Sequence, residues 1–222
     1  MRSSIDHLAV AATSIEGRQL DELLGVDLAP GGRHARMGTH NRLLRLGPTS
    51  YLELISIDPQ GTAPGHPRWF ELDEPAMKAR LATGPRLVHW VARVESTELP
   101  PLPIDVGPWE QFQRGDLSWQ LTVRGDGTLP ADGVVPSLIF WPGPMHPAAR
   151  LPDVGVRLEA LELAERIQPV PGTDVDLGGP KDVLRVVEAQ RPDRESGQPG
   201  ELADAQHPRH SNLVRGDHRR LR

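Results

Sequence analysis

The sequence contains no cysteine, which excludes disulfides, thiolate metal sites, iron–sulfur clusters and a cysteine nucleophile. No apolar run approaches the roughly 20 residues of a membrane-spanning helix, and no secretory signal peptide is visible at the start. Lysine and arginine number 25 against 30 acidic residues, without a long basic stretch, which argues against nucleic-acid binding. We therefore expect a cytoplasmic globular protein that acts on a small molecule, with neither nucleic acid nor membrane as partner.

The usual nucleotide and hydrolase motifs are absent as well. No G-x-S-x-G, P-loop or G-x-G-x-x-G sequence occurs, which disfavours hydrolase, NTPase and Rossmann-type functions. Aromatic residues make up 4% of the chain, and none follows Trp141. The end of the chain therefore cannot bury enough apolar area to offset its ordering entropy. We expect a domain over residues 1–165 and a divergent, largely disordered tail over 166–222. A divergent tail and a frameshift in the gene both account for the change in composition.

Proline and glycine are abundant, with 23 and 22 residues among 222. This composition favours short strands and many turns. Ser14 is expected to cap a helix that runs to Leu24, and a second helix is expected at Glu74–Leu81, whereas Pro30–Gly32 is typical of a turn. The prolines at 100, 101 and 103 exclude a regular helix over 95–107. The expected strands are Ile5–Ala11, Asn41–Leu46, Tyr51–Ile57, Arg86–Val94, Leu117–Val123, Val134–Trp141 and Val156–Leu163.

The order of these elements repeats weakly along the chain. Ile5-Asp6-His7-Leu8 lines up with Leu87-Val88-His89-Trp90, so each half begins with a histidine at the third place of a short apolar strand. We expect a first module at about 3–60, a linker with a helix at 64–83 and a second module at about 86–145. A period near 80 residues indicates two β-rich modules around a shared cleft rather than a solenoid.

Three polar side chains stand within these apolar strands. Glu53 lies in the middle of Tyr51-Leu52-Glu53-Leu54-Ile55, where a buried carboxylate needs a cation, a donor or water. His7 and His89 occupy matching places in matching strands. Two imidazoles and a carboxylate form a three-ligand set that suits Fe(II), Zn(II), Mn(II) or Ni(II). The alternatives are buried histidines with local partners and a Glu53 that pairs with Arg42 or Arg45.

Several stretches of the chain match one family. The most specific are Asp6-His7-Leu8, Gly38-Thr39-His40-Asn41-Arg42-Leu43 and Tyr51-Leu52-Glu53-Leu54. Over roughly residues 3–165 the sequence resembles the glyoxalase-like domain family of the vicinal oxygen chelate superfamily. The resemblance implies an α+β fold in which paired βαβββ modules form a curved, barrel-like mixed sheet around a cavity.

The resemblance also implies a divalent metal ion, bound by one residue from the first and last strands of each module. These positions correspond to His7 and Glu53 in the first half and to His89 and Phe140 in the second. Phe140 departs from the family pattern because a phenyl ring cannot ligate. Glu53 is in addition a candidate general base, and His40 is the second candidate catalytic residue.

The function expected from these residues is that of a metal-dependent enzyme acting on a small oxygenated molecule. Isomerase, lyase and dioxygenase chemistry all suit such a centre, and the fold does not choose among them. The alternative is a metal-free protein of the same fold that binds or sequesters small molecules. Arg42 is expected in a structural ion pair, and His34 and His146 at the surface. A homodimer is compatible with the sequence.

Overall fold

The computed structural model describes residues 3–162 of the chain. The chain divides into two units, Met1–Val154 and Gly155–Arg222. In the second unit only residues 155–162 are described, and they contain no helix or strand. The strand expected at Val156–Leu163 is therefore wrong over the part that the structure describes, although its residues alternate in polarity.

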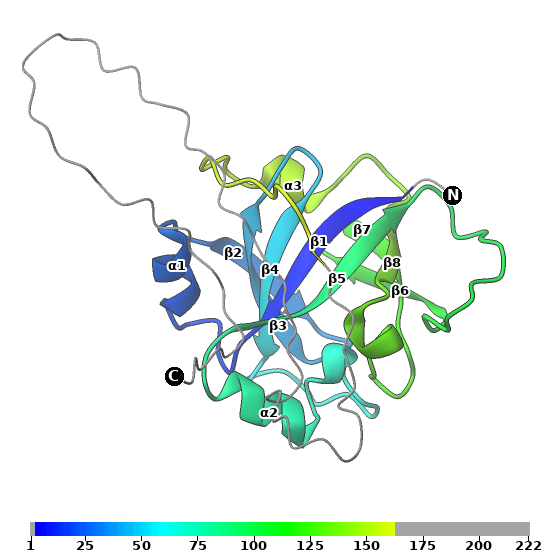
Figure 1. The fold of residues 1–222 in the computed structure, drawn as a ribbon, viewed down its shortest axis with the longest axis horizontal. Coiled ribbons are helices and arrows are strands. Elements are labelled where there is room, and N and C mark those ends of the chain that lie inside the picture. The colour runs from blue at the N-terminus through cyan, green and yellow to red at the C-terminus, as the bar shows by residue number, and fades with distance from the viewer. Residues whose placement is uncertain (1–2, 163–222) are drawn as a thin grey trace, which may run out of the picture. The chain divides into compact units, whose positions relative to one another are not determined.

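The first unit is built mainly from strands (Figure 1). They are β1 Ser3–Ala11, β2 Ala29–His34, β3 Thr39–Arg45, β4 Tyr51–Ile57, β5 Arg86–Val94, β6 Trp109–Arg114, β7 Leu117–Thr122 and β8 Ser137–Phe140. The helices are α1 Gln19–Leu24, α2 Pro75–Leu81 and α3 Pro147–Arg150, with 3-10 turns η1 Trp69–Glu71 and η2 Pro130–Gly133. Among residues 3–162, no helix combines the length and apolar character needed to cross a bilayer. The expected tail at 166–222 lies outside the described residues.

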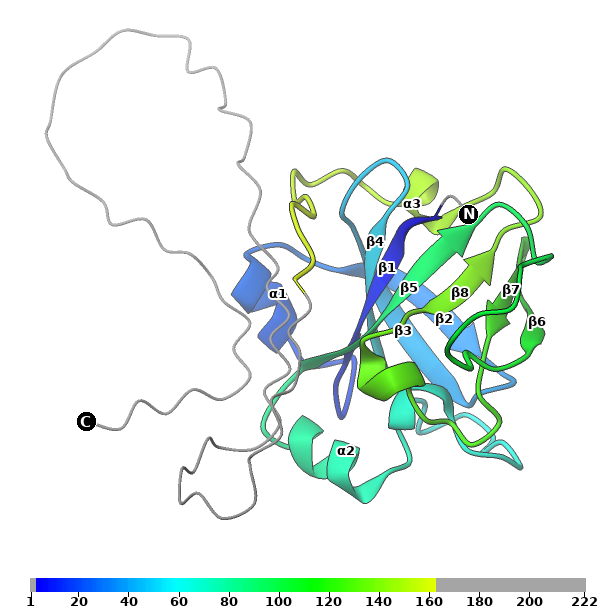
Figure 2. The ribbon, with the colours of Figure 1, turned by 45° about the vertical axis from the view of Figure 1, so that its right-hand side comes forward.

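The eight strands form one mixed sheet in the order β2-β3-β4-β1-β5-β8-β7-β6. Its two halves share one pattern, because β1 pairs with β4 and β5 pairs with β8 in parallel, while β1 and β5 join the halves antiparallel. The sheet curls until it is nearly closed into a barrel (Figure 2). The expected α+β fold with a curved, barrel-like mixed sheet is confirmed.

The linker between the halves supplies much of the core on the concave face. Its buried residues pack against inward-facing residues of the sheet, among them Ile55, Val91 and Ile139. Figures 1 and 2 show α2 and the turn before it at the lower end of the sheet. The expected helix at Glu74–Leu81 is confirmed as α2, with Pro75 in its first turn. The linker residues in this core are Trp69, Phe70, Leu72, Met77 and Leu81.

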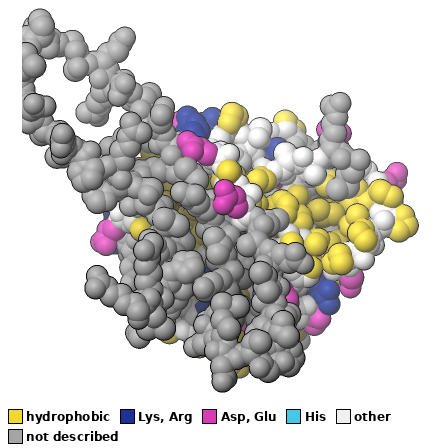
Figure 3. All heavy atoms as spheres, in the orientation of Figure 1, with side chains coloured by type: hydrophobic (Ala, Val, Ile, Leu, Met, Phe, Trp, Pro, Cys, Tyr) yellow, Lys and Arg dark blue, Asp and Glu magenta, His cyan; other side chains and the backbone are white. Residues whose placement is uncertain are grey.

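The outer faces of the two halves are covered differently. In the first half Arg42 of β3 donates to both carboxylate oxygens of Asp21 in α1, at 2.9 and 2.5 Å, which confirms the expected structural ion pair. The second half has a loop between β5 and β6 instead of a helix, as its prolines predict. Leu102 and Ile104 of this loop are exposed, and Figure 3 shows hydrophobic side chains gathered on that side.

Two expectations for the first half are wrong. The helix expected from Ser14 begins only at Gln19, because the Ser14 hydroxyl accepts the backbone N–H of Glu16 in a turn before the helix. The turn expected at Pro30–Gly32 is instead part of β2, which pairs with β3 through a register shift between Pro30 and Arg33. This irregular pairing explains how a Gly- and Pro-rich segment forms a strand.

Glycine is required at one position of β2. A Cβ atom at Gly31 would overlap the side-chain oxygen and the backbone carbonyl of Asn41 on β3. We therefore expect Gly31→Ala to lower the free energy of unfolding by about 1–3 kcal/mol, as overpacked core positions do. Urea denaturation monitored by tryptophan fluorescence measures this change.

The matched control is Gly17→Ala, where a Cβ atom meets nothing within 4 Å. Its effect should stay within about 0.5 kcal/mol of the wild type, as for surface substitutions. Equal stability of the two variants would show that the close approach of Gly31 and Asn41 does not constrain the fold.

Candidate active site

A pocket lies on the concave side of the sheet. Its polar residues come from five strands: His7 from β1, His34 and Asn41 from β2 and β3, Glu53 from β4 and Arg114 from β6. Both halves of the sheet therefore contribute to it. The remaining lining residues are Tyr51, Trp69, Phe70, Trp119, Leu121, Ile139, Trp141 and Pro147.

His7 is held by the carboxylate of Asp6. The His7 Nδ1–H donates to Asp6 Oδ1 at 2.8 Å, so the Nε2 lone pair is left for the pocket side. Nε2 lies 3.8 Å from Glu53 Oε2, and the imidazole stacks on Tyr51 with ring centroids 4.7 Å apart. A carboxylate behind an imidazole fixes the tautomer and the ring orientation. His7 is thereby prepared to act as a base or a ligand through Nε2.

Asp6 is fully buried and accepts from several donors. Besides His7 it accepts from Trp141 Nε1 at 3.0 Å, from two nitrogens of Arg93 at 2.8 and 2.9 Å and from His146 Nε2 at 3.1 Å. Burial raises the pKa of Asp6, but the hydrogen bonds from His146 and His7 outweigh it, and the pKa lies well below its ordinary value. Asp6 is therefore a fixed negative charge behind the pocket.

Glu53 lies on the pocket side of β4. Its Oε1 accepts the Asn41 amide at 2.5 Å, whereas Oε2 faces His7 at 3.8 Å. Neither Arg42 nor Arg45 contacts it, because Arg42 binds Asp21 and Arg45 binds the carbonyl of Gly47. The two arginine alternatives for Glu53 are therefore wrong, and the partner that satisfies its carboxylate is a neutral amide.

His34 was expected at the surface, but it is buried in the pocket wall. Its Nδ1 lies 3.0 Å from Thr39 Oγ1, and Nε2 lies 3.2 Å from Asn41 Nδ2 and 3.8 Å from Glu53 Oε1. Burial lowers the pKa of His34 to about 4 despite the charge of Glu53, and the cation of Arg114 lowers it further. His34 is therefore neutral at pH 7 and can accept a proton or a hydrogen bond through Nε2.

His146 was also expected at the surface and is buried. Its Nδ1 accepts the backbone N–H of Ala148 at the start of α3, so Nε2 carries the proton donated to Asp6. This histidine reaches Asp6 from a turn 140 residues further along the chain, and no local pattern in the sequence indicates that approach.

The third predicted ligand, His89, is not among the residues that line the pocket. Its Nε2 accepts the backbone N–H of Ser137 at 3.0 Å and lies 3.1 Å from the Ser137 hydroxyl. The opposite nitrogen, Nδ1, is buried without a hydrogen-bond partner. Burial lowers the pKa of His89 to about 3, with a further contribution from His7. The structure thus brings His7 and Glu53 together but turns His89 toward Ser137.

The position that matches Glu53 in the second half is Ser137, not Phe140. Ala9 pairs with Glu53 in the first half, and Val91, which follows His89 as Ala9 follows His7, pairs with Ser137. Phe140 lies three residues further on and packs with Leu138 in the cluster on the opposite face of the sheet. The assignment of Phe140 to the cavity is therefore wrong.

His40, the second predicted catalytic residue, is half-buried and does not line the pocket. Its Nε2 lies 2.8 Å from the hydroxyl of Ser56, its direct partner on β4. Because side chains alternate along a strand, His40 and the neighbouring Asn41 point to opposite faces of β3. Asn41 is the residue of this motif that reaches Glu53.

The donor set does not fit the predicted three-ligand metal site. Within residues 3–162, no group of three histidine, aspartate or glutamate side chains is arranged to hold a metal ion. His7 and Glu53 offer two donors, whereas protein zinc sites use three or four. The Asn41 amide nitrogen lies against both Glu53 Oε1 and His34 Nε2, and Arg114 Nη1 lies 3.4 Å from His34 Nε2.

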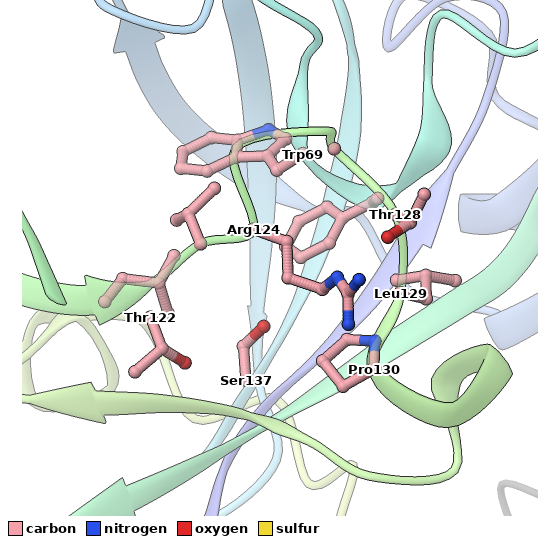
Figure 4. Close-up of a pocket in the computed structure, with 11 residues that line it drawn as sticks. Trp69, Thr122, Arg124, Thr128, Leu129, Pro130 and Ser137 are labelled. Atoms are coloured by element: carbon pink, nitrogen blue, oxygen red, sulfur yellow. The ribbon is translucent and has the colours of Figure 1, made fainter. Parts of the chain in front are cut away.

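A second pocket of about 270 Å³ lies beyond Trp69 and Phe70, which line both pockets. Figure 4 shows the guanidinium of Arg124 extending toward Thr128 and Pro130, with Ser137 below. Arg124 has an acidic partner, Asp126, to which it donates two hydrogen bonds of 3.4 Å each. This second pocket contains no carboxylate or imidazole in its lining.

The chain matches the model of the glyoxalase-like domain family over residues 5–170. It belongs to the glyoxalase-like domain family. The resemblance seen in the sequence is thereby confirmed, and the strand motifs that carried it lie on β1, β3 and β4 of this glyoxalase-like fold. No curated protein matches the chain.

Solved structures with a similar fold include a hypothetical protein from Staphylococcus aureus, at 16% identity and a TM-score of 0.40, covering 64% of this chain and 59% of that one. This glyoxalase-like chain thus spans 59% of that protein's length. Methylmalonyl-CoA epimerase from Streptomyces coelicolor (the Q60A variant in complex with 2-nitronate-propionyl-CoA) is 13% identical, with a TM-score of 0.38 and coverage of 63% and 97%. The epimerase from Mycobacterium tuberculosis is 15% identical, with a TM-score of 0.33 and coverage of 63% and 88%.

Sequence reasoning missed three residues of this glyoxalase-like pocket. His34 lies in a segment expected to be a turn, and Arg114 precedes a glycine in the turn between β6 and β7. Asn41 was quoted only as part of a family motif. The signal that could have found Asn41 is its place on the inward face of β3, directly beside a buried carboxylate.

The two neutral histidines predict how stability depends on pH. The folded pKa values of His34 and His89 lie below the ordinary value near 6.5, so the unfolded chain binds more protons between pH 6.5 and 4. The contribution of the two neutral histidines to the free energy of unfolding is complete above pH 6.5 and is lost as the pH falls through this window. We expect the free energy of unfolding to drop by about 2 kcal/mol per histidine between pH 7 and 5.

Urea denaturation at both pH values measures this drop. His34→Gln should reduce the drop, because the variant no longer binds a proton on unfolding at this position. His66→Gln is the control, since His66 is exposed and bonds only its neighbour's carbonyl. An unchanged drop in His34→Gln would contradict the assignment.

Proposed function

We propose that this protein is an enzyme that moves a proton at a carbon atom beside a carbonyl group of a small oxygenated molecule. Glu53 Oε2 is the base that removes the proton. The observation that carries the proposal is that a buried carboxylate and an oriented imidazole face one pocket 3.8 Å apart, each fixed from behind. General bases positioned in this way typically contribute 10²–10⁴-fold to the rate.

The neighbours of Glu53 support this role. Asn41 holds Oε1, so Oε2 is directed by a hydrogen bond that leaves it able to accept a proton. His7 is the second proton acceptor of the pocket, because Asp6 occupies its Nδ1 and leaves Nε2 free to receive one. His7 and Glu53 are both buried, which strengthens their electrostatic interactions with a bound molecule.

Isomerisation, epimerisation and elimination all begin with such a proton transfer. They fall within the isomerase and lyase classes expected from the sequence. The residues of the pocket bind, orient and carry protons in this proposal.

Hydrogen–deuterium exchange tests the proposal without knowledge of the natural substrate. The protein is incubated in D₂O with small 2-oxo acids, ketones and thioesters, and loss of the α-proton signal is followed by NMR. We expect catalysed exchange in at least one compound and a 10²–10⁴-fold slower rate in Glu53→Gln, because the amide cannot take up the proton. Glu74→Gln is the control at an exposed position.

The outcome also separates the alternative function. Five aromatic side chains, Tyr51, Trp69, Phe70, Trp119 and Trp141, line the pocket and favour the binding of an apolar molecule. Binding of test compounds without exchange in the wild type would overturn the enzymatic proposal in favour of a binding protein. An unchanged exchange rate in Glu53→Gln would overturn the role of Glu53.

Metal content tests the predicted role of His89. Because His89 Nε2 accepts from Ser137, we expect His89→Ala to retain the same amount of metal as the wild type after dialysis against Zn(II) or Mn(II). Elemental analysis measures it, with His7→Ala in parallel. Near-stoichiometric metal that is lost in both variants would instead support the predicted His7, Glu53 and His89 ligand set.

A further inference from the structure

Arg114 is the cation that lines the pocket beside Glu53 and His7. It ends β6, at the far edge of the sheet from β2, and its side chain passes over Gly32 of β2. A Cβ atom at Gly32 would lie 2.6 Å from Arg114 Cδ, so a side chain there would displace the arginine. Gly32 of the first half, which has no side chain, thus leaves space for Arg114 of the second half.

Within the described part of the chain, only one of the three nitrogens of this guanidinium makes a hydrogen bond. Nη1 donates to Asn41 Oδ1 at 3.0 Å and lies 3.4 Å from His34 Nε2. Within residues 3–162, neither Nη2 nor Nε of Arg114 makes a hydrogen bond, and no carboxylate lies within 4.0 Å of the group. Arg42 and Arg93, by contrast, each bind an aspartate through two nitrogens.

An unpaired guanidinium in an aromatic pocket is a receptor for an anion. Its planar fork matches two oxygens held in one plane, and such charge-assisted bonds are about twice as strong as neutral ones. Trp69 lines the same pocket and has a buried Nε1–H without an acceptor in the described chain. The nitrogens of Arg114 that face the pocket without a partner indicate a bound group with oxygen acceptors.

We propose that Arg114 binds a carboxylate group of the substrate through two of its nitrogens, so that the substrate is a small carboxylate. This inference rests on the proposed function of the pocket and names its substrate class. The guanidinium binds both oxygens, and its positive charge offsets the repulsion between their negative charge and that of Glu53. Arg114 is a binding residue of the site, and Gly32 and Asn41 position it.

Oxalate is a suitable probe, because it is a small carboxylate without a C–H bond and cannot react by proton transfer at carbon. Quenching of tryptophan fluorescence reports its binding, since Trp69, Trp119 and Trp141 line the pocket. The measurement is made on the full chain with EDTA present. We expect Arg114→Gln to raise the dissociation constant at least tenfold and Arg114→Lys to give an intermediate value, because lysine keeps the charge but not the fork.

The matched control is Arg124→Gln, which removes a cation from the second pocket, where Trp69 is also part of the wall. Its dissociation constant for oxalate should equal that of the wild type. Thermal melting of each variant shows that it is folded. Wild-type affinity in both Arg114 variants overturns the inference, and so does an equal loss in Arg124→Gln, which would indicate unspecific attraction of anions.

Glu53→Gln separates this inference from the proposed function. The variant keeps Arg114 and removes a negative charge, so we expect it to bind oxalate at least as tightly as the wild type while losing proton exchange. Loss of oxalate binding in Arg114→Gln together with wild-type exchange in Glu53→Gln would leave the anion site standing and overturn the proton-transfer function. Oxalate binding that is unchanged in Arg114→Gln, together with proton exchange that is lost in Glu53→Gln, would overturn the anion site and leave the proton-transfer function standing.

Discussion

The amide of Asn41 is the constraint on which the geometry of the pocket depends. Its oxygen accepts the backbone N–H of Gly32 at 2.8 Å and Nη1 of Arg114 at 3.0 Å. Its nitrogen donates to Glu53 at 2.5 Å and lies 3.2 Å from His34. An amide has two donors and two acceptor sites, and here all four are used. One neutral side chain thereby fixes a base, an imidazole and a cation that come from three other strands.

A second buried group, Asp6, fixes the orientation of His7 in the same way. An isolated carboxylate at this depth would be very costly, and the bonds from Arg93, Trp141, His7 and His146 offset that cost. These donors come from both halves of the sheet and from the turn before α3. The two networks meet between His7 Nε2 and Glu53 Oε2, which are left without a short bond to each other. Fixed surroundings and two open acceptors are what a preorganised site for proton transfer requires.

The parts of this fold that the sequence predicts are those set by local pattern. The apolar runs of Tyr51–Ile57 and Arg86–Val94 define strands with the bounds that the structure has. The strand β2 could not be predicted, because its glycines and prolines have low strand propensity and its pairing depends on contacts with β3 and β6. The burial of His34 follows from that strand and was missed with it.

The two histidines show why a repeat in sequence does not guarantee a repeat in chemistry. His7 is preceded by Asp6, which fixes its ring, whereas the residue before His89 is Val88, which offers no acceptor. Ser137 occupies the position of the second half that matches Glu53, and its backbone N–H donates to Nε2 of His89. The second half therefore has no acid at either matching place, and its histidine is bound to Ser137. The cation in this pocket is supplied by Arg114 at the edge of the sheet, so the chemistry of the cavity is asymmetric although the backbone around it repeats.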